Sequence, residues 1–141
     1  QWVLGSQFYN PIKCIDEIAP DAVFVDLCIN DPNAPTDLAT YRASLVTIGQ
    51  TILDASIDLI FSVGVPSDPA TRPAYSIQNQ YRSAVYSVAQ QLDVPLIDER
   101  TKFVSYEVAN SNGWMMDDIH PNNVGYPIRA NLRRDFIRAV A

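Results

Sequence analysis

The sequence is poor in the residues that metal centres and disulfide frameworks require. It has one histidine and two cysteines among 141 residues. Cys14 and Cys28 are too few to define a disulfide framework, and a lone histidine leaves only scattered carboxylates as further metal ligands. A glycine-rich phosphate loop is also missing. We therefore predict no metal and no cofactor.

Positive charge and long apolar runs are also scarce. Ten Lys and Arg stand against sixteen Asp and Glu, which gives a formal net charge of -6. Such a surface disfavours nucleic acid as a partner, because phosphate contacts need basic side chains. No apolar stretch reaches the roughly 20 residues of a spanning helix, so we predict no membrane span.

What the chain does have is a regular alternation of short apolar runs with amphipathic segments. Its apolar content of 48% is enough for one domain over residues 1–141. Runs over 22–28, 57–63 and 94–97 have strand length and are rich in branched or aromatic residues. The alternation predicts an α/β domain with a parallel sheet, and the run over 22–28 is expected to be buried on both faces.

Apolar residues at helical spacing lie between and after these strands. Each stripe is predicted to pack in the core. An additional helix is expected through Ile12, Ile15 and Ile18, with Asn10 and Pro11 at its start. The stripes consist of Tyr41, Leu45, Ile48 and Ile52; of Tyr81, Val85, Val88 and Leu92; and of Val124, Ile128, Leu132 and Phe136.

Two proline-rich loops, 31–37 and 66–73, follow the carboxyl ends of predicted strands. Sites in open parallel sheets form at that edge. We therefore expect both loops to meet the segment that holds the single histidine.

That segment reads Asp-Asp-Ile-His-Pro-Asn-Asn-Val-Gly-Tyr over residues 117–126. An aspartate beside an imidazole fixes its tautomer and stabilises the imidazolium that forms when it takes a proton from a hydroxyl. Asp117 and His120 are thus candidates for an acid and base pair. A helix-entry histidine without a catalytic role is the simpler interpretation of the pair alone.

Together with Asn30-Asp31 at the end of the first strand, this segment resembles the SGNH hydrolases, also called GDSL-type esterases and lipases. The resemblance covers about residues 1–140 and implies a three-layer α/β/α fold with a flavodoxin-like sheet. It implies that His120 is the general base, that Asp117 orients it, and that Asn30 donates to the oxyanion. Cys28 departs from the family, which usually has glycine there.

The Gly-Asp-Ser nucleophile block of the family is absent. Gly5-Ser6 resembles either the second block, with the Gly5 N–H in the oxyanion hole, or a degenerate first block, with Ser6 as the nucleophile. We favour the first interpretation because it preserves the connection lengths. The missing first strand would be central in the order 2-1-3-4-5, so its loss would leave unpaired backbone groups beside 22–28.

We therefore expect residues 1–141 to be the C-terminal part of the domain, with the first strand and its serine upstream or on another polypeptide. The resemblance implies a serine esterase that cleaves acyl or acetyl esters of a small molecule or carbohydrate. A non-catalytic SGNH-like binding or assembly module is the alternative, and an unrelated flavodoxin-like domain is a third.

Other polar and apolar residues have structural interpretations. Asp26 lies in a strand and is predicted to pair with a backbone or helix group rather than to act in catalysis. Asp98 is predicted to cap the turn after the last strand. Trp114, Met115 and Met116 either wall an acyl or sugar pocket or simply pack, and packing is the commoner role.

Overall fold

A computed structural model of the chain describes residues 15, 18–27, 37–71 and 77–140. Three parallel strands pair in the order β1-β2-β3, with Val25 opposite Phe61 and Ser62 opposite Ile97. The elements are β1 (Ala22–Asp26), α2 (Leu38–Asp54), β2 (Asp58–Val63), α3 (Gln78–Leu92), β3 (Leu96–Asp98), α4 (Arg100–Phe103), α5 (Tyr106–Ser111) and α6 (Gly125–Val140).

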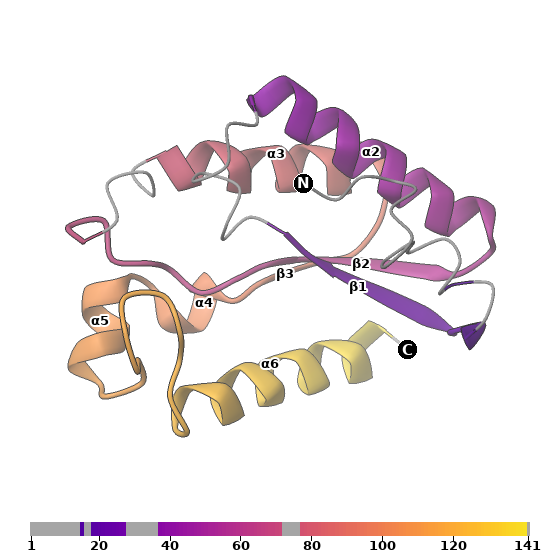
Figure 1. The fold of residues 1–141 in the computed structure, drawn as a ribbon. Coiled ribbons are helices and arrows are strands. Elements are labelled where there is room, and N and C mark those ends of the chain that lie inside the picture. Colours follow the sequence, from indigo (N-terminus) through magenta and orange to yellow (C-terminus); the bar gives the residue numbers. More distant parts are fainter. Residues whose placement is uncertain (1–14, 16–17, 28–36, 72–76, 141) are drawn as a thin grey trace.

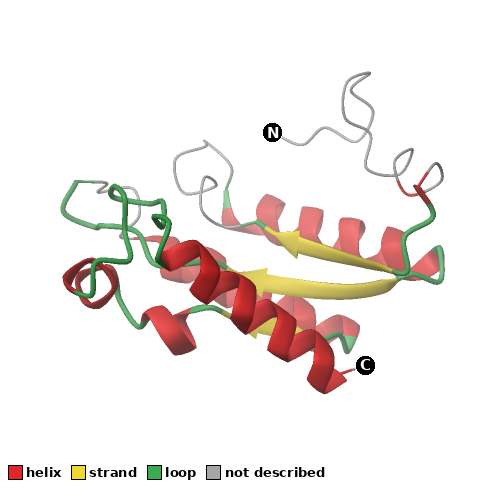
Figure 2. Ribbon diagram, turned by 90° about the horizontal axis from the view of Figure 1, so that it is seen from below, coloured by secondary structure: helices red, strands yellow, loops and turns green. Residues whose placement is uncertain are grey.

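Helices lie on both faces of the sheet. Helices α2 and α3 cover one face, and α4, α5 and α6 lie on the other (Figure 1). The predicted α/β architecture with a parallel sheet is confirmed. Figure 2 shows that the strands point toward the end of the molecule where the loops before α6 gather.

The main core lies between the sheet and helices α2 and α3. The predicted stripes of both helices face it, with Leu45 and Val88 essentially inaccessible. Strand β2 supplies alternate residues to this core, as expected from the two-residue period of a strand. The fully or nearly buried members are Val25, Tyr41, Leu45, Ile52, Ile57, Leu59, Phe61, Val63, Tyr81, Ala84, Val85, Val88 and Ala89.

A smaller core lies under the carboxyl end of the sheet. Val65, Phe103, Ala109 and Met115 are buried there, with Trp114 stacked edge-on against Phe103 at a ring distance of 5.5 Å. Helices α4 and α5, which the sequence did not predict, build this core. Ser105 starts α5, and its side chain accepts the Val108 N–H.

Ion pairs attach α6 to the sheet. Glu99, which follows β3, has no exposed surface and contacts the Nε of Arg129 at 2.6 Å and the Nε of Arg133 at 2.7 Å. Both arginines also bond Asp26 of β1, and Arg133 reaches Ser62 of β2 at 3.3 Å. We call Asp26, Glu99, Arg129 and Arg133 the charge network.

The charge network favours the charged form of Arg133. Burial alone would lower the pKa of Arg133, but the negative charges of Glu99 and Asp26 outweigh burial and raise that pKa above its ordinary value. The prediction that Asp26 pairs with a helix group is confirmed. Asp98 also accepts the Arg100 N–H at 2.9 Å, so the predicted cap after β3 is confirmed.

Two burial predictions are wrong. Strand β1 is not buried on both faces: Ala22 and Asp26 are exposed, and Val23 and Phe24 are half-buried. Among the described residues, no strand pairs with the edge of β1 that faces away from β2. A strand with one unpaired edge keeps more of its surface in solvent than a central strand does.

The predicted burial of the apolar stripe of α6 is also wrong. Val124 is 51% exposed because it precedes the helix, in the turn that leads into it. Ile128, Leu132 and Phe136 are only half-buried. Charged contacts thus supply much of the attachment of α6 to the sheet.

Candidate active site

Asp117 and His120 occupy a tight turn between α5 and α6. One carboxylate oxygen of Asp117, Oδ1, accepts the backbone N–H of Ile119 at 2.9 Å and that of His120 at 2.7 Å. The other, Oδ2, lies 2.8 Å from Nδ1 of His120. Aspartate favours such turns because its short side chain bonds the backbone two or three residues on. The turn therefore places the His120 imidazole beside the Asp117 carboxylate.

These hydrogen bonds keep Asp117 ionised. The Ile119 N–H contributes most, followed by the His120 side chain and the His120 N–H, and together they lower the pKa of Asp117 from 3.8 to about 2. A carboxylate only accepts hydrogen bonds, so Nδ1 of His120 must carry a proton. In the neutral ring Nε2 is then the unprotonated nitrogen. The His120 side chain is 51% exposed, so solvent reaches the ring.

The loop after β2 meets this turn, as predicted. The Asp68 N–H donates to the Asp118 carbonyl at 2.8 Å, and the Thr71 hydroxyl donates to the Asp118 carboxylate at 3.2 Å. These residues are about fifty positions apart in sequence, so the contacts depend on the parallel sheet bringing both segments to one edge. Loop 31–37 lies outside the described residues except for Asp37, whose side chain caps α2.

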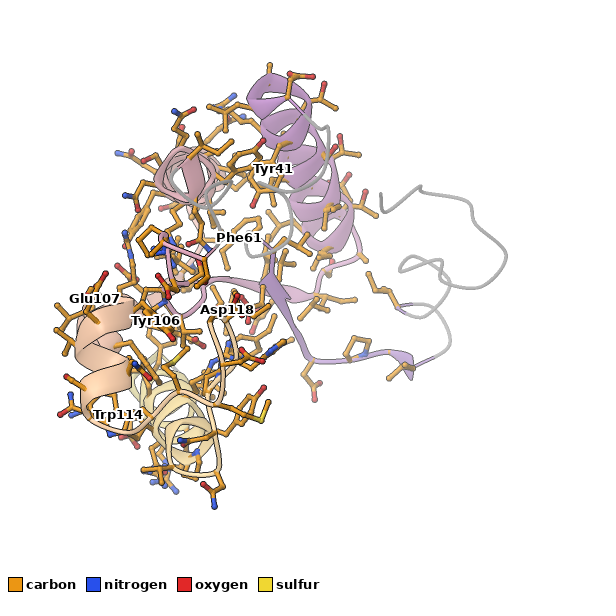
Figure 3. All side chains as sticks on the ribbon, turned by 60° about the vertical axis from the view of Figure 1, so that its left-hand side comes forward. Tyr41, Phe61, Tyr106, Glu107, Trp114 and Asp118 are labelled. Carbon is orange, nitrogen blue, oxygen red and sulfur yellow. The ribbon has the colours of Figure 1, made fainter. Side chains whose placement is uncertain are left out.

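Aromatic and apolar side chains border the turn. In Figure 3, Tyr106, Trp114 and Asp118 lie on the opposite side of the sheet from Tyr41. Burial raises the pKa of the Tyr106 phenol, and the negative charges of Asp68 and the neighbouring aspartates raise it further. The phenol therefore lies within electrostatic reach of the carboxylates around His120.

Two of the three residues before Asp117 have the packing role predicted for them. Trp114 and Met115 pack in the smaller core, and Met115 is only 7% exposed. Met116 is 66% exposed and donates its backbone N–H to the His120 carbonyl at 2.8 Å. Only Met116 of these three presents most of its side chain to solvent beside the turn.

Three predicted site residues, Gly5, Ser6 and Asn30, lie outside the described residues. Their roles as oxyanion donors or nucleophile remain predictions. Sequence reasoning missed Thr71 and Tyr106, which no local motif marks. It also missed the bonds of Asn122, although an Asn before a helix is a recognisable capping signal.

The described part of the chain contains no cluster of three or more His, Cys, Asp or Glu side chains arranged to hold a metal ion. Within the same residues, no helix combines the length and apolar character needed to cross a membrane.

Comparison with known proteins identifies the family. The model of the GDSL-like lipase/acylhydrolase family matches residues 7–128, which is most of the chain. No curated protein matches the sequence.

Solved structures share the fold. The chain is similar to a lipase/acylhydrolase from Enterococcus faecalis, with a TM-score of 0.74 and 20% identity, over 92% of this chain and 69% of that structure. It is also similar to an acetyl xylan esterase, with a TM-score of 0.74 and 18% identity, over 94% of this chain and 76% of that structure.

A catalytic mutant of an acetylxylan esterase from Geobacillus stearothermophilus gives a TM-score of 0.65 and 22% identity, over 91% of this chain and 65% of that structure. At these identities the likeness concerns the fold. The family model and the shared fold agree, and this chain belongs to the GDSL-like lipase/acylhydrolase family.

Proposed function

We propose that this domain is a serine esterase that hydrolyses acyl or acetyl esters, with Asp117 and His120 as its acid and base pair. The observation that carries the proposal is the 2.8 Å contact between Asp117 Oδ2 and His120 Nδ1. Membership of an acylhydrolase family supports ester hydrolysis. The acetylxylan esterases among the similar structures support an acetyl ester of a carbohydrate as the substrate class.

In the proposed reaction, Nε2 of His120 accepts the proton of a serine hydroxyl as the serine oxygen bonds to the ester carbonyl carbon. The carbonyl electrons move onto oxygen, and the Gly5 N–H and the Asn30 side chain stabilise the resulting oxyanion. Asp117 stabilises the imidazolium.

The tetrahedral intermediate then collapses, and the departing alkoxide takes the proton from His120. A water molecule repeats the sequence on the acyl-enzyme, which releases the carboxylic acid and restores the serine. Every proton in this cycle passes through His120, and the reaction requires no cofactor.

We propose that the nucleophilic serine lies on a strand that pairs with the outer edge of β1, in a segment upstream or on another polypeptide. The half-buried Val23 and Phe24 and the half-buried apolar face of α6 support an additional element beside β1. Ser6 is the alternative nucleophile.

A fluorophosphonate probe tests the proposed reaction class, because it labels an activated serine. We expect the protein to be labelled, to hydrolyse p-nitrophenyl acetate, and to lose both properties in His120→Ala. Mapping the labelled peptide distinguishes Ser6 from another serine. A folded protein that neither reacts nor hydrolyses the ester, alone or with an added segment carrying a Gly-Asp-Ser block, would instead be a non-catalytic module.

A further inference from the structure

We propose that Asn122 is a positioning residue that holds His120 in its orientation toward Asp117. This inference rests on the proposed function for its catalytic consequence, but its structural part does not. Asn122 lies two residues after His120, at the entrance of α6, and its side chain is bonded to both sides of the turn.

The side chain of Asn122 makes four hydrogen bonds. Its Oδ1 accepts the backbone N–H of Val124 at 2.8 Å and that of Gly125 at 3.1 Å, which caps α6. Its Nδ2 donates to the carbonyls of Gly113 at 2.7 Å and Met115 at 3.1 Å. Both N–H donors of the amide and both lone pairs of its oxygen are therefore used.

These partners enclose the catalytic turn. The two carbonyls lie just before Asp117, and the two N–H groups lie just after Pro121, so Asn122 closes a loop that contains both Asp117 and His120. Its own N–H also donates to the Trp114 carbonyl at 2.9 Å. Met115 and Pro121 form an antiparallel bridge inside the same loop.

Gly125 shows how closely the two sides of this loop approach each other. A Cβ atom at Gly125 would stand 2.3 Å from the Trp114 carbonyl oxygen, a separation that no side chain tolerates. Glycine lets the backbone of α6 reach that carbonyl. The loop is therefore closed by a backbone contact that depends on glycine and by the four bonds of one amide.

All four side-chain hydrogen bonds of Asn122 go to backbone groups and none to the His120 ring, so we infer that it acts through the backbone. Asp117 and the His120 ring are joined by a short turn inside the loop that Asn122 closes. Because Asn122 anchors both ends of this loop, it restricts how far the turn can shift. A displacement of about 1 Å at a catalytic group is enough to reduce the rate about 100-fold.

The test compares Asn122→Ser with Asn123→Ser. Serine at 122 keeps an oxygen that can cap α6 but cannot donate to two carbonyls, whereas Asn123 is exposed and adjacent. We expect Asn122→Ser to lower kcat for p-nitrophenyl acetate about 10- to 100-fold with little change in KM. Asn123→Ser should match the wild type in both.

Nitrogen NMR of the ring supplies a readout that does not depend on catalysis, because His120 is the only histidine. We expect distinct protonated Nδ1 and unprotonated Nε2 signals in the wild type and in Asn123→Ser, and averaged tautomers in Asn122→Ser. Wild-type kcat together with a wild-type ring spectrum in Asn122→Ser would overturn the proposal. If the wild type has no esterase activity but the ring signals are still altered in Asn122→Ser relative to the wild type, the positioning role stands and only the proposed function is removed.

If thermal melting shows that Asn122→Ser does not fold, Asn122→Asp replaces it. Aspartate has the same shape and keeps the capping oxygen, but it lacks both N–H donors. Asn123→Asp is its control because it places the same charge one residue away. An Asn122→Asp ring spectrum identical to that of Asn123→Asp would refute the positioning role.

Discussion

Two groups of paired charges in this domain differ in their surroundings and in their chemistry. In the charge network, the Glu99 side chain has no exposed surface and is bound by Arg129 and Arg133, which also bond Asp26. At the turn before α6, the side chains of Asp117 and His120 are 42% and 51% exposed.

The residue types and the exposure of the two groups determine what each group can do. Arginine stays protonated at all ordinary pH values, so the charge network can hold α6 on the sheet but cannot exchange protons. Histidine is the side chain that changes charge near neutral pH. A single exposed pair that includes histidine can therefore transfer protons, provided that its geometry is held by other residues.

The largest expected effect comes from removing the exposed base. His120→Ala should lower kcat/KM for ester hydrolysis by about 10²- to 10⁴-fold, the usual contribution of a positioned general base. Its thermal unfolding should stay close to that of the wild type, because the ring is half-exposed. A control is Asn131→Ala, at an exposed position on α6. Unchanged hydrolysis in His120→Ala would refute the assigned role of the histidine.

Breaking the buried group should affect stability instead. Glu99→Gln keeps the shape of the side chain but removes the negative charge that pairs with the guanidinium groups of Arg129 and Arg133. We expect it to lower the free energy of unfolding by about 3–5 kcal/mol, nearer the lower figure because both arginines retain some solvent contact. Urea denaturation measures this change. A loss below about 1 kcal/mol would show that the network contributes no more than a surface ion pair.

The pH dependence of Asp117 is the next smaller effect. The pKa of Asp117 in the folded protein is about 2, below the ordinary value of 3.8. The ionised carboxylate therefore contributes fully to the stability of the turn above pH 3.8, and this contribution is lost as the pH falls through about 2. Carbon NMR of the carboxyl should give a midpoint near 2. His120→Ala should raise this midpoint only in part, because both backbone donors remain. A wild-type midpoint near 3.8 would contradict the described turn.

The smallest effect is expected at the surface pair next to the charge network. Arg134 bonds Asp135 at 2.7 Å, but both side chains are more than half exposed. Arg134→Ala should change the free energy of unfolding by no more than about 0.5 kcal/mol. A loss comparable to that of Glu99→Gln would show that burial does not explain the difference between the two arginine sites.

The sequence predicted the parts of this domain whose signals are local. Apolar runs predicted the three strands to within two residues at the ends that the structure describes, and the spacing of Tyr41 and Leu45 predicted the core face of α2. Asp117 and His120 could be paired from sequence because they are only three positions apart.

Long-range partnerships could not be predicted in the same way. Asp26 and Arg133 are 107 residues apart, and Thr71 and Asp118 are 47 apart, so only the folded sheet brings them together. The exposure of Val124 was missed because helical spacing continues into the turn before α6. The burial of strand 22–28 was overestimated because composition does not reveal whether a strand edge is paired.

Nitrogen NMR of the wild-type His120 ring most directly tests the claim that Asp117 prepares His120 as a base. Since this is the only histidine, its two nitrogen signals need no separate assignment to a residue. At a pH where the ring is neutral, the structure predicts a proton on Nδ1, bonded to Asp117, and none on Nε2. A ring protonated on Nε2, or one that divides its proton evenly between the nitrogens, would contradict the claim.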